Sequence, residues 1–157
     1  MPISVAAPSE LGHLAGPLRE LVTQTLKWER RRAGEIAILL ADDEKLRELN
    51  RQWRGIDRAT DVISFAFDEN EPDAGARPVT GDIAVSMDRV RAQAKRFHVR
   101  EPVELARLVI HGTLHLAGHD HAEAAERRIM RAREESALRA VKVVVTRLGA
   151  AMRREGR

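Results

Sequence analysis

Apolar residues recur along the chain with two periods, which predict helices alternating with strands. Between residues 17 and 30 they stand three or four positions apart, which predicts a first helix. Ile36, Ile38 and Leu40 alternate within a short apolar run and predict a strand. Asp42 follows that strand as a suitable N-cap for a second helix.

The second half of the chain continues this alternation. Residues 62–67 are apolar on both faces and predict a strand buried on both sides, whereas the acidic, proline-containing residues 68–80 predict a loop. A short strand is expected at 83–85 and a basic helix at 88–97. The helix that begins near Pro102 is apolar on nearly every side and must run through the core.

The C-terminal segment predicts a last helix that extends from about residue 122 into the 140s. Its expected inward positions are Ile129, Met130 and Leu138. Strands that alternate with helices over 157 residues indicate one α+β or α/β layered domain.

The amino-acid composition limits which metal ligands, partners and cellular locations are expected. The chain has no cysteine, so a metal would need nitrogen and oxygen ligands. No apolar run is long enough for a membrane span, and the first residues lack the features of a secretory signal, so an intracellular protein is expected. Bases exceed acids in the last 36 residues, which suits a nucleic-acid partner but equally a solvated helix face. With 3% aromatic residues and no Tyr, no platform for base stacking is expected.

Four of the six histidines lie within eleven residues, in the segment HGTLHLAGHDH. His111 and His115 are four apart and share one helix face, so both can reach one ion. Gly118 can end the helix in a left-handed conformation, and the reversal can return His121 to the same ion. Three imidazoles would leave a fourth metal position open, as in catalytic zinc sites.

This spacing is that of the metzincin zinc motif, with one departure. Gly112 stands where those metalloproteases need the glutamate that acts as general base. The alternative to metal binding is a polar helix end. His119 is either a further ligand or a neighbour, and Asp120 either a turn residue or a group that orients an imidazole.

The histidine segment resembles the signature of the YbeY family of ribosomal-RNA maturation endoribonucleases, HGxLHLxGYDH, with His119 in place of the tyrosine. Two further blocks are similar to that family. Leu49-Asn50, Trp53-Arg54-Gly55 and Thr60 to Phe65 resemble its LN..yRg….TDVLSF block, and Gly81-Asp82-Ile83 resembles its GDI element.

The resemblance implies His111, His115 and His121 as ligands of one zinc ion per chain, and Arg54 as the functional arginine that faces the metal. It implies an α+β fold with a four-stranded mixed sheet and about five helices, and residues 140–157 as an extension beyond the motifs. Its implied substrate is single-stranded RNA rather than DNA, cut during maturation of the small-subunit ribosomal RNA 3′ end and in ribosome quality control. The implied partners are the small subunit or its assembly proteins, and the implied location is the cytoplasm.

The residues alone leave two other classes of protein possible. The ion could stabilise a ribosome-assembly factor that binds RNA without cutting it. A metallohydrolase of peptides or esters is disfavoured by Gly112. Taken alone, Arg54 would be a surface arginine paired with Asp57 or Asp61, and Asp61 and Asp82 are expected to hydrogen-bond backbone near strand ends. Whether water or a ribose hydroxyl attacks the phosphorus is open.

Overall fold

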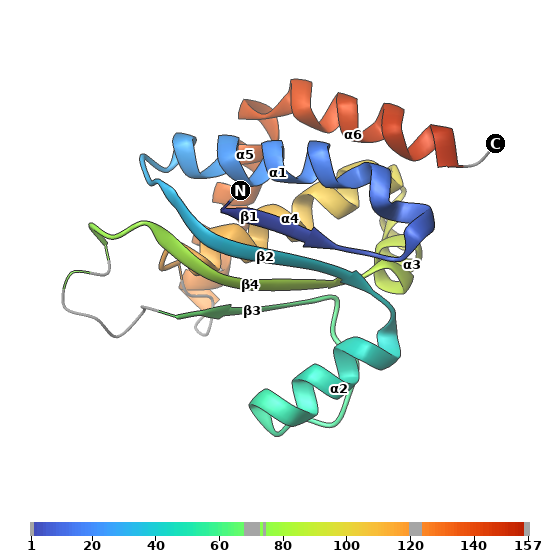
Figure 1. The fold of residues 1–157 in the computed structure, drawn as a ribbon, viewed down its shortest axis with the longest axis horizontal. Coiled ribbons are helices and arrows are strands. Elements are labelled where there is room, and N and C mark those ends of the chain that lie inside the picture. Colours follow the sequence, from blue (N-terminus) through green and yellow to red (C-terminus); the bar gives the residue numbers. More distant parts are fainter. Residues whose placement is uncertain (1, 68–72, 74, 120–123, 156–157) are drawn as a thin grey trace.

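A four-stranded sheet is the centre of the computed structural model, which describes residues 2–67, 73, 75–119 and 124–155 (Figure 1). The strands are β1 (Ile3–Ala6), β2 (Ala33–Ala41), β3 (Val62–Ala66) and β4 (Val79–Ser86). Their order is β1-β2-β4-β3, with β1, β2 and β4 parallel and β3 antiparallel to β4. The predicted α+β fold with a mixed four-stranded sheet is confirmed.

Six α-helices lie in the described residues, one more than the resemblance implied. They are α1 (Ala15–Trp28), α2 (Asp43–Arg54), α3 (Met87–Phe97), α4 (Glu101–Leu116), α5 (Ala124–Ala140) and α6 (Lys142–Glu155). The expected last helix is therefore two helices, which meet at the buried Val141. The pattern also did not predict β1 or the 3₁₀ helix at Ser9–Leu14.

The main core lies between one face of the sheet and the helices α1, α4 and α6. Inward side chains alternate along β2 and β4, and α4 is buried on nearly every side, as its sequence predicted. Buried side chains of β2, β4 and α4 in this core include Ile36, Ile38, Leu40, Ile83, Leu105, Leu108, Val109, Ile110 and Leu114. Most of the interior is therefore built around α4, which carries the histidine pair.

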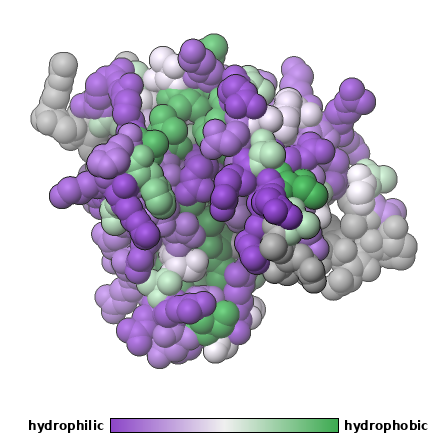
Figure 2. All heavy atoms as spheres, turned by 180° about the vertical axis from the view of Figure 1, so that it is seen from behind, coloured by the Kyte–Doolittle hydropathy of each residue, from purple (hydrophilic) through white to green (hydrophobic). Residues whose placement is uncertain are grey.

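On α5, two of the three expected inward positions are correct. Met130 is buried and Leu138 packs against the core, but Ile129 is 58% exposed. Adjacent helical residues are about 100° apart, so Met130 and Ile129 cannot both face α4. None of the helices in the described ranges combines the length and apolarity needed to cross a bilayer. Figure 2 shows hydrophilic side chains over much of the back of the molecule.

The opposite face of the sheet is covered only at one end, by α2. Leu46 of α2 packs against Ile63 of β3 and Ala84 of β4, and Figure 1 shows α2 standing apart from the other helices. The expectation that residues 62–67 are buried on both sides is therefore wrong. These residues form an edge strand, and Phe67 at its end is 61% exposed. An apolar alternation cannot reveal whether another element covers each face.

The segment between β3 and β4 was expected to be a loop over residues 68–80. Residues 68–72 and 74 lie outside the described residues, but β4 already begins at Val79 and extends to Ser86. The strand expected at 83–85 is thus longer than predicted. Of its added residues, Gly81 and Asp82 pair with β3, where Gly81 lies opposite Ala66.

Candidate metal and phosphate site

The histidine pair lies in the last turns of α4, as its spacing predicted. Between the two histidines, Gly112 packs directly against β4: a Cβ added there would lie 2.8 Å from Cγ2 of Ile83. Gly112 is buried and α4 approaches the sheet closely at this residue. The place where a metalloprotease needs its glutamate is therefore filled by the core.

Each ring of the pair has its Nδ1 engaged by an oxygen from another element. His111 Nδ1 is 2.8 Å from Oε1 of Glu134 on α5, and His115 Nδ1 is 2.6 Å from the hydroxyl of Ser64 on β3. Such oxygen partners fix the orientation of metal-binding imidazoles. The two bonds assign Nε2 as the nitrogen with which each ring would bind a metal.

Glu134 belongs to a buried chain of charged groups that leads away from the pair. Only 3% of Glu134 is exposed, and Arg107 Nη1 lies 3.6 Å from its Oε1. Arg107 also donates two hydrogen bonds to the buried Glu104, which raises the pKa of Arg107 above its usual value. Gln93 of α3 donates to the same carboxylate at 2.6 Å. Glu134 is thus held by α4 while it contacts His111.

The chain leaves α4 as the sequence predicted. Gly118 has φ +105°, and the backbone N–H of His119 donates to the carbonyl of Leu114. The imidazole Nε2 of His119 contacts Oε1 of Glu29 at the end of α1. The structure therefore gives His119 a carboxylate partner. The predicted third ligand, His121, and its neighbour Asp120 lie outside the described residues.

One further carboxylate belongs to this region. Glu126, in the first turn of α5, stands four and eight residues before Met130 and Glu134, on the face of α5 that packs against α4. Its Oε2 is buried and has no hydrogen-bond partner within the described part of the chain. A buried carboxylate oxygen is costly unless a cation or a donor meets it.

Arg54 is the last residue of α2, which ends at Gly55 in the left-handed conformation with φ +70°. Its Nη2 donates to the carbonyl of Ser64 at 3.2 Å, and its guanidinium carbon lies 5.7 Å from the centre of the Phe65 ring. Partial burial of the guanidinium lowers the pKa of Arg54, but arginine stays charged at neutral pH. A fixed positive charge therefore stands at the edge of the sheet.

Ser64 connects the two halves of the site. Its hydroxyl contacts His115, and its carbonyl accepts the hydrogen bond from Arg54. One imidazole of the pair and a guanidinium thus meet at one residue of an edge strand, although they come from α4 and α2. A divalent cation and an arginine are the groups that oppose the negative charge of a phosphoryl transition state.

The three acidic residues near Arg54 and the strand ends have different partners. Asp57 pairs with Arg47 and not with Arg54, and their ion pair lowers the pKa of Asp57. Asp61 accepts a hydrogen bond from the backbone N–H of Val62, as expected. For Asp82 the expectation is wrong within the described residues, where its carboxylate accepts no backbone hydrogen bond. Asp82 lies on the uncovered face of β4, and burial raises its pKa.

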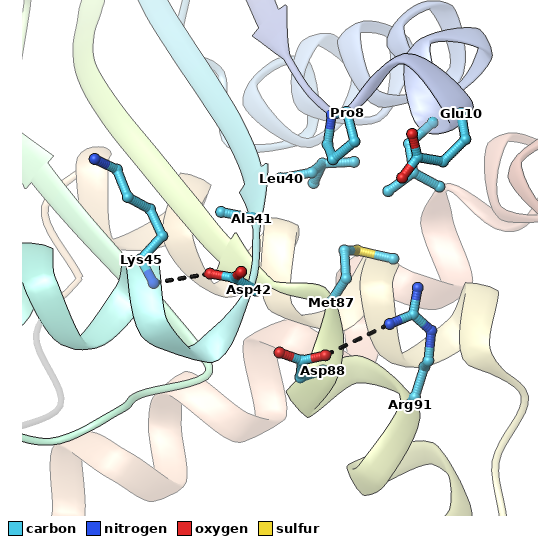
Figure 3. Close-up of a pocket in the computed structure, with 10 residues that line it drawn as sticks. Pro8, Glu10, Leu40, Ala41, Asp42, Lys45, Met87, Asp88 and Arg91 are labelled. Carbon is cyan, nitrogen blue, oxygen red and sulfur yellow. Dashed lines mark hydrogen bonds and ion pairs between the residues drawn. The ribbon is translucent and has the colours of Figure 1, made fainter.

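A separate hollow of about 430 Å³ opens where β2 and β4 end, as Figure 3 shows. None of its lining residues belongs to the histidine segment. Its polar groups already serve the fold: Asp42 caps α2 by accepting from the N–H of Lys45, and Asp88 accepts from the N–H of Asp43. Arg91 lies 3.7 Å from Asp88. This hollow gives no second phosphate site.

Sequence reasoning missed Ser64 and Glu134, because each is far from its histidine along the chain. It also missed an aromatic group beside Arg54. The rings of Trp53 and Phe65 are 6.1 Å apart, and Trp53 is 64% exposed. A low aromatic content did not reveal that these two rings lie together.

Fold and site together define a small α+β protein in which a histidine pair on a core helix stands across an edge strand from an arginine. The chain belongs to the endoribonuclease YbeY family, whose model matches residues 7–142. This confirms the resemblance drawn from the motifs.

Individual relatives agree with the family. The Endoribonuclease YbeY of Desulfitobacterium hafniense is 42% identical over 137 residues, which cover 83% of this chain and 87% of that protein. The Endoribonuclease YbeY of a Roseiflexus species is 49% identical over 114 residues, covering 68% of this chain and 70% of the other. The solution structure of TM1509 from Thermotoga maritima matches with a TM-score of 0.63 at 30% identity, covering 88% of each chain.

Proposed function

We propose that the protein is a zinc-dependent endoribonuclease that cuts single-stranded RNA during maturation of the small-subunit ribosomal RNA. Family membership supports the endoribonuclease activity. The observation that carries the mechanism is the position of Ser64, which contacts both His115 and Arg54. Such a role would involve the small ribosomal subunit or its assembly proteins as partners, in the cytoplasm.

The residues present fit a zinc ion. The ligand set would be His111, His115 and His121, all nitrogen donors that zinc accepts. The oxygen partners of both described imidazoles support this assignment. When bound, zinc would act as a Lewis acid at neutral pH.

The protein groups have distinct tasks in this proposal. Glu134 and Ser64 hold the two imidazoles in orientation. Arg54 binds a phosphate oxygen through its planar fork of N–H donors and opposes the charge that develops at phosphorus. Its contact with the Ser64 carbonyl and its stacking on Phe65 hold the guanidinium in place before RNA arrives.

A peptidase of the metzincin kind is the weaker alternative, and the structure adds a reason. The contact between Gly112 and Ile83 leaves no room for the glutamate side chain that such an enzyme needs after its first histidine. This proposal therefore assigns RNA and not peptide as the substrate.

Removal and return of zinc tests the activity. Zinc-loaded protein is expected to cut a single-stranded RNA, to lose roughly 100-fold in rate with a chelator, and to recover on addition of zinc. The rate is measured on end-labelled RNA, with a duplex of the same sequence as the control that stays uncut. Cutting that is indifferent to chelation contradicts the proposal. A folded, zinc-loaded protein that binds this RNA without cutting it indicates the assembly-factor alternative.

Replacement of Glu134 tests how the site is held. Glu134→Ala is expected to weaken zinc binding roughly 10- to 100-fold, because His111 loses the partner that orients its ring. Glu134→Gln keeps an acceptor oxygen and should lose less. Zinc affinity is measured by competition with a chelating dye. The control is Glu135→Ala, an exposed neighbour on α5, which should bind zinc like the parent protein. Equal affinities for all the variants would contradict this role.

A further inference from the structure

Three of the five aromatic residues of the chain gather at the exposed edge of the sheet. Trp53 is the penultimate residue of α2, Phe65 lies near the end of β3, and Phe67 follows that strand. Trp53 is 64% exposed and Phe67 is 61% exposed. Side chains this large and apolar contribute most to stability when buried, so two of them in solvent at one place indicate a binding surface.

The fold explains why these rings stay uncovered. β3 is an edge strand, and α2 covers the sheet only as far as Leu46, Ile63 and Ala84. Phe65 packs partly against this small cluster and carries the tilted Trp53 ring at 6.1 Å, with 57° between the ring planes. The Trp53 ring therefore packs on Phe65 on one side, while much of its surface faces solvent.

The aromatic group adjoins the proposed phosphate-binding arginine. The guanidinium carbon of Arg54 lies 5.7 Å from the centre of the same Phe65 ring, and its Nη2 donates to the backbone carbonyl of the preceding residue, Ser64. Arg58 is exposed nearby in the chain and adds positive charge. Proteins that bind single-stranded nucleic acid combine cationic groups that contact the backbone with aromatic rings on which bases stack.

We propose that Trp53 and Phe65, with Phe67 beside them, form a stacking subsite for an unpaired nucleobase whose adjoining phosphate contacts Arg54. This inference rests on the proposed function and specifies how the substrate is held. A ring face accepts any base, so the subsite selects unpaired over paired RNA and does not read sequence. A duplex cannot use it, because its bases are already stacked on one another.

The test measures RNA binding without cleavage. A short single-stranded RNA is titrated into chelator-treated protein carrying Trp28→Phe, so that quenching reports on Trp53 alone. Fluorescence anisotropy of labelled RNA gives the affinity of the variants. Trp53→Ala is expected to weaken binding about 5- to 150-fold, the equivalent of one lost base stack. Trp53→Phe should keep most of the affinity.

Two controls separate stacking from charge and from folding. Phe97→Ala removes an aromatic side chain that is 52% exposed and lies under Arg96 on α3, and it should bind RNA normally. An abasic oligonucleotide should bind the parent protein and Trp53→Ala equally, because only the backbone contacts remain. Circular dichroism confirms that the variants are folded.

The outcomes distinguish this inference from the nuclease proposal. Base-dependent binding through Trp53 in a protein that never cuts RNA supports the subsite and rejects the nuclease. Normal RNA binding by Trp53→Ala, with zinc-dependent cutting intact, overturns the subsite and leaves the nuclease standing. Loss of ribosomal-protein binding in Trp53→Ala, with RNA binding unchanged, also overturns it and assigns the aromatic surface to a protein partner.

Discussion

Replacing Arg54 by alanine is expected to reduce RNA cleavage about 100- to 1000-fold while zinc content and stability stay close to those of the parent protein. The magnitude is that of losing one preorganised donor to a developing oxyanion. Stability should change little because Arg54 is largely exposed and its guanidinium donates to a backbone carbonyl at the edge strand. Single-turnover cleavage, with the protein in excess of the RNA and well above the Kd, isolates the chemical step from binding.

Two variants sharpen this prediction. Arg54→Lys keeps the positive charge but loses the planar fork, so an intermediate rate is expected. Arg51→Ala removes an exposed arginine from the same turn of α2 and should cut at nearly the parent rate. Equal loss in Arg51→Ala and Arg54→Ala would mean that general charge, and not the position beside Ser64, matters. Unchanged cutting by Arg54→Ala would reject its role.

Replacing His115 by alanine is expected to remove the metal and with it the cleavage. His115 is one of the three proposed ligands, and its partner Ser64 would lose the imidazole it orients. The zinc-to-protein ratio, measured by mass spectrometry after dialysis, should fall from one toward zero, and cutting should not return at micromolar zinc.

The matched control is His98→Asn. His98 caps α3 with φ 55°, a conformation that asparagine tolerates, and it precedes α4 at the end opposite to His115. This variant should keep both zinc and activity. Equal RNA cutting by His115→Ala and Arg54→Ala at the parent rate would indicate a contaminating nuclease. Full zinc retention in His115→Ala would reject the ligand assignment.

The predictable part of the fold is the part set by short-range patterns. β2, α2, α3 and α4 lie close to their expected places because periodicity and caps such as Asp42 act within a few residues. β1 is only four residues long and is stabilised by parallel pairing with β2, more than thirty residues away. Strand order, and with it the exposure of β3, depends on which elements cover the sheet, which no local pattern encodes.

The candidate site also has a part that the sequence predicts and a part that it does not. His111 and His115 could be found because one turn of helix separates them. Their partners Glu134 and Ser64 are brought to them by the packing of α5 and β3, at sequence separations of 23 and 51 residues. The gathering of Trp53 and Phe65 depends on where α2 ends relative to the edge strand. Such long-range contacts need the folded chain.

The proposed zinc centre of three imidazoles beside Arg54 is tested most directly by X-ray absorption at the zinc edge. The zinc-loaded protein is expected to give three imidazole nitrogens at about 2.0–2.1 Å and one further oxygen or nitrogen. His115→Ala should lose this signal. A shell made mainly of carboxylate oxygens, or one that is the same in His115→Ala, would contradict the account.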